Sequence, residues 1–252
     1  MFQEGQSKEI RNLEWYGGFI SDKIITTSET IKEEIKKIYG FEEWKIAMIP
    51  NGVSLHKFSA PIDRWSVKKP YGVGVWDPVC LFVGRMVVQK GADLLLESIP
   101  SILADVPTAK FFFIGDGYMR SHLEHRAQEL GVHQATKFLG YVSESELINF
   151  YKACDVVCIP SRNEPFGIVA LEAWAAGKPI VVTNNGFDFV WHDINGLMVY
   201  DNPNSIAWGI KTIFSDPERA RWMGTNGRKA AEIFSWDNIA RITSGVYKEI
   251  LG

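Results

Sequence analysis

The chain has 252 residues, of which 46% are hydrophobic and 23% charged, and its formal net charge is -3. This composition can fill a sizeable core and excludes a disordered chain. A slightly negative chain offers no general attraction to nucleic acid or to an anionic membrane, so we expect neither as a partner.

The amino terminus and the cysteines indicate the cellular compartment. The first residues are too polar for a signal peptide, and no apolar run approaches the roughly 20 residues that span a bilayer. Cys80, Cys154 and Cys158 match no disulfide framework or zinc pattern and lie in or beside apolar runs. We therefore expect a cytoplasmic protein with reduced core cysteines.

Four segments follow one another along the chain. Residues 1–53 are predicted to form helix, strand, helix and strand, too few elements to bury a core alone, so self-association is possible. Residues 54–78 are rich in Pro and Gly and predict a linker. Residues 79–234 alternate short apolar runs with segments of helical period, which indicates repeated βα units. Residues 235–252 predict an amphipathic helix.

The strand candidates VCLFVG, KFFFIG, DVVCIP and PIVVT are apolar almost throughout. Such runs are typical of parallel strands that helices cover on both faces. The predicted fold class is therefore α/β, a doubly wound, Rossmann-like parallel sheet. Ligands of such sheets bind beyond the carboxyl ends of the strands, where this chain has Gly, charged and hydroxyl residues.

A first candidate site combines cations with a helix start. Gly84 and Arg85 end one predicted strand, and Lys90 and Gly91 begin the next predicted helix. Free amides, the helix dipole and two cations together make an anion site that suits a diphosphate. Taken alone, the pattern also fits ordinary surface charges.

A second motif runs from Glu164 through Pro165-Phe166-Gly167 to Glu172, with Ser161 ahead of it and an apolar helix behind. Carboxylates accept hydrogen bonds and so suit sugar hydroxyls. Glycine in the turn lets the backbone approach a ligand closely. Either glutamate singly fits a solvated loop or helix charge.

The chain has in succession a predicted strand, Ser-x-x-Glu-Pro-Phe-Gly, an apolar helix with a second Glu, Gly-x-Pro and another strand. This succession resembles the signature region of GT-B retaining glycosyltransferases of the glycogen or starch synthase type. The resemblance covers most of the chain. Residues 1–53, with Pro50-Asn51-Gly52-Val53, look like the end of the family's amino-terminal domain, and residues 79–234 like its nucleotide-sugar-binding domain.

The resemblance implies a role for each matching residue. Arg85 and Lys90 would hold the donor diphosphate, and Glu164 with the amides of Phe166 and Gly167 would hold the transferred sugar. The remaining substrate-binding positions are Glu172 at the ribose, Tyr141 near the base, Gly115 and Gly117 at the base pocket or in a mere turn, and Gly84, Ile168, Val169 and Gly186.

The implied reaction passes glucose from ADP-glucose or UDP-glucose to an α-glucan hydroxyl with retention. The donor is a substrate, and no cofactor is expected. No Asp-x-Asp pair occurs, and the five histidines form no ligand set, so we expect no metal.

Two departures from the family pattern stand out. Residues 183–188 carry one glycine where the family has a longer Gly-Gly turn, which leaves the geometry at Gly186 open. The rest of the amino-terminal domain, with the acceptor groove, is missing, so we expect half an enzyme that binds the donor but transfers nothing.

Three alternatives remain. The chain could be a non-catalytic nucleotide-sugar-binding module or split subunit that needs a partner. It could also belong to a GT-B transferase of another sugar. A nicotinamide-dependent oxidoreductase is disfavoured, because no strand ends in Gly-x-Gly-x-x-Gly with an acidic residue beyond it.

Overall fold

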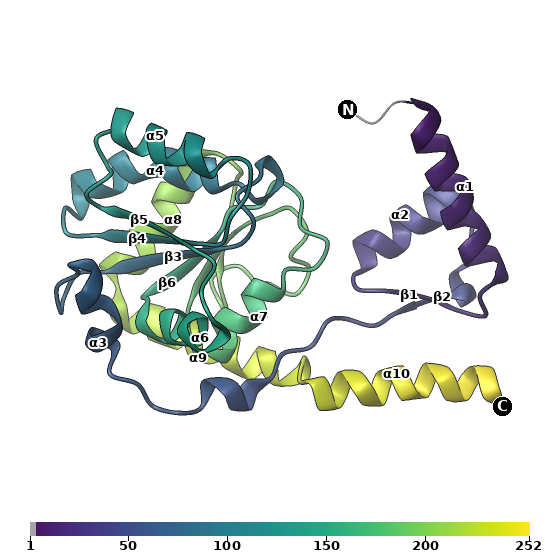
Figure 1. The fold of residues 1–252 in the computed structure, drawn as a ribbon. Coiled ribbons are helices and arrows are strands. Elements are labelled where there is room, and N and C mark those ends of the chain that lie inside the picture. Colours follow the sequence, from purple (N-terminus) through teal and green to yellow (C-terminus); the bar gives the residue numbers. More distant parts are fainter. Residues whose placement is uncertain (1–3) are drawn as a thin grey trace. The chain divides into compact units, whose positions relative to one another are not determined.

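The apolar runs of the chain form two parallel sheets in the computed structural model, which describes residues 4–252 (Figure 1). The chain divides into two units. The larger comprises Gly52–Ser235, and the smaller contains the described residues up to Asn51 together with Trp236–Gly252.

The larger unit is built on a six-stranded parallel sheet with strand order β5-β4-β3-β6-β7-β8. The strands are β3 (Val79–Val83), β4 (Lys110–Ile114), β5 (Thr136–Gly140), β6 (Val156–Ile159), β7 (Ile180–Thr183) and β8 (Leu197–Val199). The order reverses between β3 and β6, which are paired directly. A ligand crevice in this kind of sheet lies at the carboxyl ends of the strands that flank such a reversal.

Helices cover both faces of this sheet (Figure 1). On one side lie α4 (Ala92–Asp105), α5 (Arg120–Glu129) and α8 (Pro203–Ser215), and on the other α3 (Arg64–Lys68), α6 (Glu144–Ala153), α7 (Ile168–Ala175) and α9 (Pro217–Ile233). Side chains of one strand point alternately to the two faces. Accordingly, Cys80 and Phe82 of β3 join one core cluster, whereas Val79 and Leu81 join the other. The predicted doubly wound α/β fold is therefore confirmed.

Local sequence signals set several helix starts. Ser143 and Glu146 form a capping box at α6, in which each side chain bonds the other residue's backbone N–H. Asn202 and Asp216 cap α8 and α9, and a proline follows each cap at the first helical position, where its missing N–H costs nothing.

Residues 54–78, predicted as a linker, belong to the larger unit. They contain α3 and two short 3₁₀ turns, Leu55–Phe58 and Lys69–Tyr71. Phe58, Lys68 and Val73 are buried there. Proline and glycine mark the turns between these short pieces, which do not form a free connector. Strand β8 was not predicted from the sequence.

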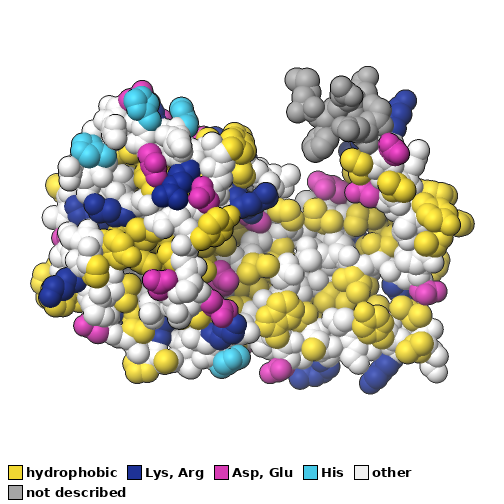
Figure 2. Space-filling model, viewed as in Figure 1, with side chains coloured by type: hydrophobic (Ala, Val, Ile, Leu, Met, Phe, Trp, Pro, Cys, Tyr) yellow, Lys and Arg dark blue, Asp and Glu magenta, His cyan; other side chains and the backbone are white. Residues whose placement is uncertain are grey.

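The smaller unit contains α1 (Glu4–Ile20), β1 (Ile24–Thr26), α2 (Glu29–Tyr39), β2 (Ile46–Met48) and α10 (Trp236–Leu251). The predicted order helix, strand, helix, strand is confirmed, and β1 pairs with β2 in parallel. Leu13, Tyr16 and Phe19 of α1 are all more than half exposed. Hydrophobic side chains gather on the visible face of this unit (Figure 2).

On the visible face of the larger unit, cationic and anionic side chains are interspersed (Figure 2). Local charge pairs therefore matter more there than a broad field of one sign. Across residues 4–252, the helices lack the combination of length and apolarity that crossing a bilayer requires.

Candidate functional site

The loops after β3, β4 and β5 are joined to one another by backbone hydrogen bonds. The amide of Gly84 donates to Ile114 O at 3.0 Å, that of Gly115 to Gly140 O at 2.8 Å, and that of Met86 to Asp116 O at 2.8 Å. The predicted site residues that follow these strands therefore share one edge of the sheet.

Gly115 and Gly117 are required by this close packing. A Cβ atom on Gly115 would lie 2.1 Å from Gly84 O, and one on Gly117 would lie 2.4 Å from Met86 O. Both contacts are with backbone, which cannot move aside cheaply. The two glycines therefore serve the turn, and their place at a base pocket stays a prediction.

Arg85 and Lys90 differ in their surroundings. The Arg85 side chain is exposed and has no hydrogen-bond or ion-pair partner within residues 4–252. Lys90 ends a 3₁₀ turn, Val88–Lys90, and its Nζ lies 2.7 Å from Glu164 Oε2. An ammonium has three donors, so this pairing leaves Lys90 able to contact a second anion.

Glu164 is only 8% exposed, and contacts from two sides fix its carboxylate. Besides Lys90, the hydroxyl of Ser161 donates to Oε2 at 2.9 Å. The loop of residues 183–188 packs directly behind: the Glu164 amide donates to Asn185 O at 3.0 Å. A Cβ on Gly186, whose φ is 104°, would lie 1.9 Å from Glu164 O. Gly186 thus supports Glu164 through the backbone.

The start of α7 presents free amides. Gly167 is its N-cap residue with φ 89° and provides no side-chain cap. The amides of Phe166, Gly167, Ile168 and Val169 have no acceptor within residues 4–252. Orphan amides at a helix amino terminus favour an anion or a sugar oxygen. The Phe166 ring itself is buried, 5.1 Å from the ring of Phe189, so only its backbone faces a ligand.

Glu172 lies within α7, and its carboxylate is turned toward α6. Tyr151 donates its hydroxyl to Glu172 Oε2 at 2.7 Å. Burial raises the pKa of Glu172, and the Tyr151 hydrogen bond opposes that rise. The pairing leaves the second carboxylate oxygen for another donor, and the ribose role stays a prediction.

Two tyrosines stand at the carboxyl edge. Tyr141, predicted near the base, is 80% exposed directly after β5. Tyr118, which sequence reasoning missed, is 75% exposed, and its hydroxyl accepts a hydrogen bond from the Val88 amide at 3.3 Å. The sequence feature that could have identified Tyr118 is an aromatic residue directly after Gly117, beyond the end of a predicted strand.

Arg162 was also missed, although it lies between Ser161 and Glu164. Its guanidinium binds Asp93 through two bonds, Nη1 to Oδ1 at 2.9 Å and Nη2 to Oδ2 at 2.6 Å. Nη1 also donates to Val88 O at 2.6 Å. Arg162 therefore joins the turn that ends at Lys90 to the loop that holds Glu164. No sequence spacing reveals this pairing, because it depends on the contact between two loops.

The assembled site offers an unpaired guanidinium, a lysine with spare donors, a fixed carboxylate and a row of free amides. These groups suit a diphosphate joined to a hydroxyl-rich group. In the part of the chain described, no three His, Cys, Asp or Glu side chains converge as metal ligands would.

The strand order and this edge of the sheet define a Rossmann-like domain that forms half of a GT-B glycosyltransferase. Comparison with known families identifies the chain more closely. It belongs to the glycosyl transferases group 1, whose pattern it matches over residues 63–230, and residues 2–57 match glycosyltransferase family 4.

Two curated relatives illustrate the relationship. An uncharacterised glycosyltransferase of Methanocaldococcus jannaschii is 40% identical over 249 residues, which cover 96% of this chain and 64% of the relative. A D-inositol 3-phosphate glycosyltransferase of Xylanimonas cellulosilytica is 30% identical, covering 91% of this chain and 57% of the relative. The chain thus spans less than two thirds of the length of these relatives.

Solved structures agree on the fold. Sucrose-phosphate synthase of Thermosynechococcus elongatus superimposes with a TM-score of 0.84 at 26% identity, covering 100% of this chain and 64% of that one. HepE of Anabaena, solved in complex with UDP and glucose, gives 0.86 at 21% identity, covering 100% and 68%. The predicted GT-B resemblance is confirmed, but none of these relatives specifically supports the narrower glycogen or starch synthase type.

Proposed function

We propose that the chain binds a nucleoside diphosphate sugar as the donor-binding half of a retaining glycosyltransferase. The observation that carries this proposal is the arrangement of Arg85, Lys90 and the α7 amino terminus at one edge of the sheet. The three features offer charge and N–H donors to a diphosphate, and Glu164 offers an acceptor to sugar hydroxyls beside them.

In the proposed reaction, the bond between the sugar and the diphosphate breaks, and negative charge grows on the leaving diphosphate. Arg85 and Lys90 would stabilise that charge, and the free amides at Gly167 and Ile168 would add fixed dipoles. Glu164, held by Lys90 and Ser161, would position the sugar. Catalysis by this half would therefore be electrostatic and positional, without a covalent nucleophile.

UDP-glucose is the first donor to test, because the HepE structure similar to this chain was also solved with UDP-glucose. ADP-glucose remains the other donor that the sequence suggests. Two acceptors are candidates. The sequence resemblance suggests an α-glucan, and the name of the curated relatives suggests an inositol phosphate.

Calorimetric titration of the chain with UDP, UDP-glucose, ADP-glucose and NAD tests donor binding directly. We expect a nucleoside diphosphate and its sugar to bind and NAD not to bind. Arg85→Ala should weaken binding, whereas Lys229→Ala, which removes an exposed lysine of α9, should not. Binding of NAD alone would contradict the proposal.

Transfer is tested separately with labelled UDP-glucose or ADP-glucose and either glycogen or inositol phosphate as acceptor. We expect the chain alone to transfer little, because a GT-B reaction takes place between two complete domains. Donor binding without transfer, even with the complementing amino-terminal segment of the M. jannaschii relative, would favour a non-catalytic nucleotide-sugar-binding module.

A further inference from the structure

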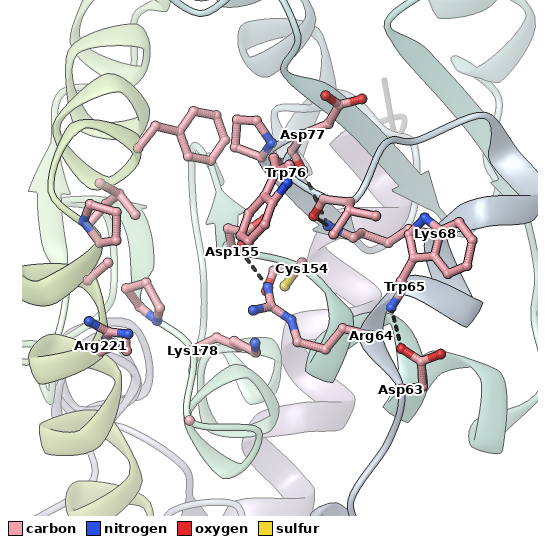
Figure 3. A pocket seen from close by; sticks show the side chains of 18 residues that line it. Asp63, Arg64, Trp65, Lys68, Trp76, Asp77, Cys154, Asp155, Lys178 and Arg221 are labelled. Atoms are coloured by element: carbon pink, nitrogen blue, oxygen red, sulfur yellow. Dashed lines mark hydrogen bonds and ion pairs between the residues drawn. The ribbon is translucent and has the colours of Figure 1, made fainter.

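The larger unit has a cavity of about 650 Å³ at the amino-terminal edge of its sheet, opposite the edge that carries the proposed donor site. Figure 3 shows the side chains that line it. Residues that immediately precede β3, β6 and β7 line it, namely Pro78, Asp155 and Pro179, and Lys178 lies next to Pro179. Strands of four or five residues separate the two edges by about 13–16 Å. The cavity is therefore distinct from the proposed donor site, and its volume suits a small ligand.

Cations outnumber carboxylates in the wall of this cavity. The cations are Arg64, Lys68, Lys178 and Arg221, and the carboxylates are Asp63, Asp77 and Asp155. Each carboxylate is already bound to backbone: Asp63 accepts from Trp65 N, Asp77 from Gly74 N, and Asp155 from Val79 N. Asp155 also binds Arg64 Nη2 at 2.5 Å. The three carboxylates keep their charge, but four cations face them, so the wall carries one positive charge in excess.

Two of the lining cations, Lys178 and Arg221, have no side-chain hydrogen bond or ion pair within residues 4–252. The side chain of Lys178 is partly buried. Burial lowers the pKa of Lys178, and Arg64 and Lys68 lower it further, whereas Cys154 and Asp155 oppose the change. A buried charge without a counterion is costly, so an anion that enters the cavity would stabilise it.

Lys68 also lines the pocket, but its ammonium is bound to backbone oxygens. It is 4% exposed, and its Nζ donates to two backbone carbonyl oxygens, Asp77 O at 3.3 Å and Val75 O at 3.5 Å. These contacts direct the Lys68 ammonium toward backbone carbonyls of residues 75 and 77. Figure 3 shows Lys178 and Arg64 extending toward one another, with Arg221 of α9 on another side of the pocket. These three cations are the ones that a ligand can reach.

Apolar groups form the rest of the wall. Trp65 and Trp76 stand on one side, and Phe214 and Pro217 lie at the junction of α8 and α9. Trp76 is 93% exposed, so its ring has no cover of its own. Aromatic and proline surfaces favour a ligand with an apolar body in addition to a charged group.

We propose that this pocket binds a small organic anion, with its carboxylate or phosphate group against Lys178, Arg64 and Arg221 and its apolar body against Trp65 and Trp76. The proposal does not depend on the donor site or on the glycosyl transfer reaction. It assigns a ligand-binding role to the edge of the sheet that faces away from the strand carboxyl ends.

The test uses the indole N–H signals of the nine tryptophans in ¹⁵N-labelled protein. Trp65→Phe and Trp76→Phe assign their two signals. Phenyl phosphate, benzoate, inorganic phosphate and the neutral benzyl alcohol are then titrated. We expect saturable shifts at Trp65 and Trp76 with phenyl phosphate or benzoate, weaker ones with inorganic phosphate, and none with benzyl alcohol.

Variants separate this pocket from the donor site. Lys178→Met and Arg221→Gln should each weaken phenyl phosphate binding at Trp65 and Trp76 roughly ten- to hundredfold while UDP affinity stays unchanged. Arg85→Ala should weaken UDP binding and leave phenyl phosphate binding at Trp65 and Trp76 unchanged. Arg221 is exposed, so its variant keeps the test valid if Lys178→Met does not fold.

Several outcomes would overturn the proposal. These are the absence of saturable shifts with both aromatic anions, equal shifts with benzyl alcohol, and undiminished binding in a folded Lys178→Met or Arg221→Gln protein. Because UDP binding is measured on the same samples, failure of this proposal is distinguishable from failure of the donor assignment.

Discussion

The ammonium of Lys90 lies 2.7 Å from the Oε2 atom of Glu164, and the two side chains are 23% and 9% exposed. A cation proposed to bind diphosphate therefore also neutralises the carboxylate proposed to hold the sugar. Arg85, in contrast, has no partner within residues 4–252.

This difference predicts that substitution of Arg85 affects UDP binding alone, whereas substitution of Lys90 affects both UDP binding and the stability of the fold. Arg85→Ala should weaken UDP binding by roughly 1.5–3 kcal/mol, the usual range for a charge-assisted hydrogen bond, and change stability by less than about 0.5 kcal/mol. Lys90→Met should weaken UDP binding and also lower stability by roughly 1–3 kcal/mol, because Glu164 loses its counterion. Calorimetry and urea unfolding measure the two effects.

A double variant serves as the control for Lys90. Adding Glu164→Gln to Lys90→Met should recover part of the lost stability, since a neutral amide needs no cation. If the two substitutions add without coupling, the ion pair contributes nothing to the fold. Equal UDP affinity of Arg85→Ala, Lys90→Met and the unmodified chain would refute the diphosphate assignment.

Arg162 is predicted to support donor binding only by holding the Lys90 turn and the Glu164 loop in place. Arg162→Ala removes both bonds to Asp93 and so weakens the link between the Lys90 turn and the Glu164 loop, which the bonds of Gln89 to Arg162 N and Asn163 O still join. UDP-glucose affinity should fall by about 1–2 kcal/mol although Arg162 is not proposed to touch the ligand. Arg126→Ala is the matched control, because Arg126 makes a similar two-bond pair with Glu97 away from these loops. An equal effect of both variants would point to general loss of stability.

Donor binding is predicted to need no divalent cation. Lys90 and Arg85 supply positive charge where a metal ion would otherwise neutralise the diphosphate. UDP affinity measured by calorimetry should therefore be the same with EDTA as with magnesium. Loss of binding in EDTA and its return with magnesium or manganese would count against the assignment.

Glu172 predicts a pH dependence of stability. Because burial raises its pKa in the folded state, the folded protein holds this proton more tightly than the unfolded chain does. Stability is therefore unaffected by this group below its unfolded pKa of about 4.3 and falls as the pH rises through the folded value. Glu172→Gln should be more stable than the unmodified chain at neutral pH.

Urea unfolding between pH 3.5 and 8 measures this difference. The advantage of Glu172→Gln should shrink as the pH falls toward 3.5, where the carboxyl is mostly protonated in both states. Tyr151→Phe provides the complementary control, since it removes the hydroxyl that donates to Glu172 and should lower stability at neutral pH. An advantage of Glu172→Gln that is constant over the whole range would contradict the assigned burial effect.

The sequence by itself determined the layout of the sheet and the edge at which the chemistry lies. Runs such as VCLFV and KFFFI have side chains that only a sheet covered on both faces can bury. Residues that follow parallel strands lie at one edge of the sheet, which is why Arg85 and Glu164 could be expected at the same edge. The direct pairing of β3 with β6 is known only from the structure.

The tertiary structure decided which side chains pair and where the cavity at the amino-terminal edge of the sheet forms. Lys90 binds Glu164 and Arg162 binds Asp93 because of how loops from different βα units pack, and within residues 4–252 the Lys178 ammonium has no hydrogen-bond or ion-pair partner. The sequence marked residues 54–78 as irregular, but it could not show that α3 packs in the larger unit and lines a pocket. Such contacts join residues far apart in the chain, so no local period or spacing encodes them.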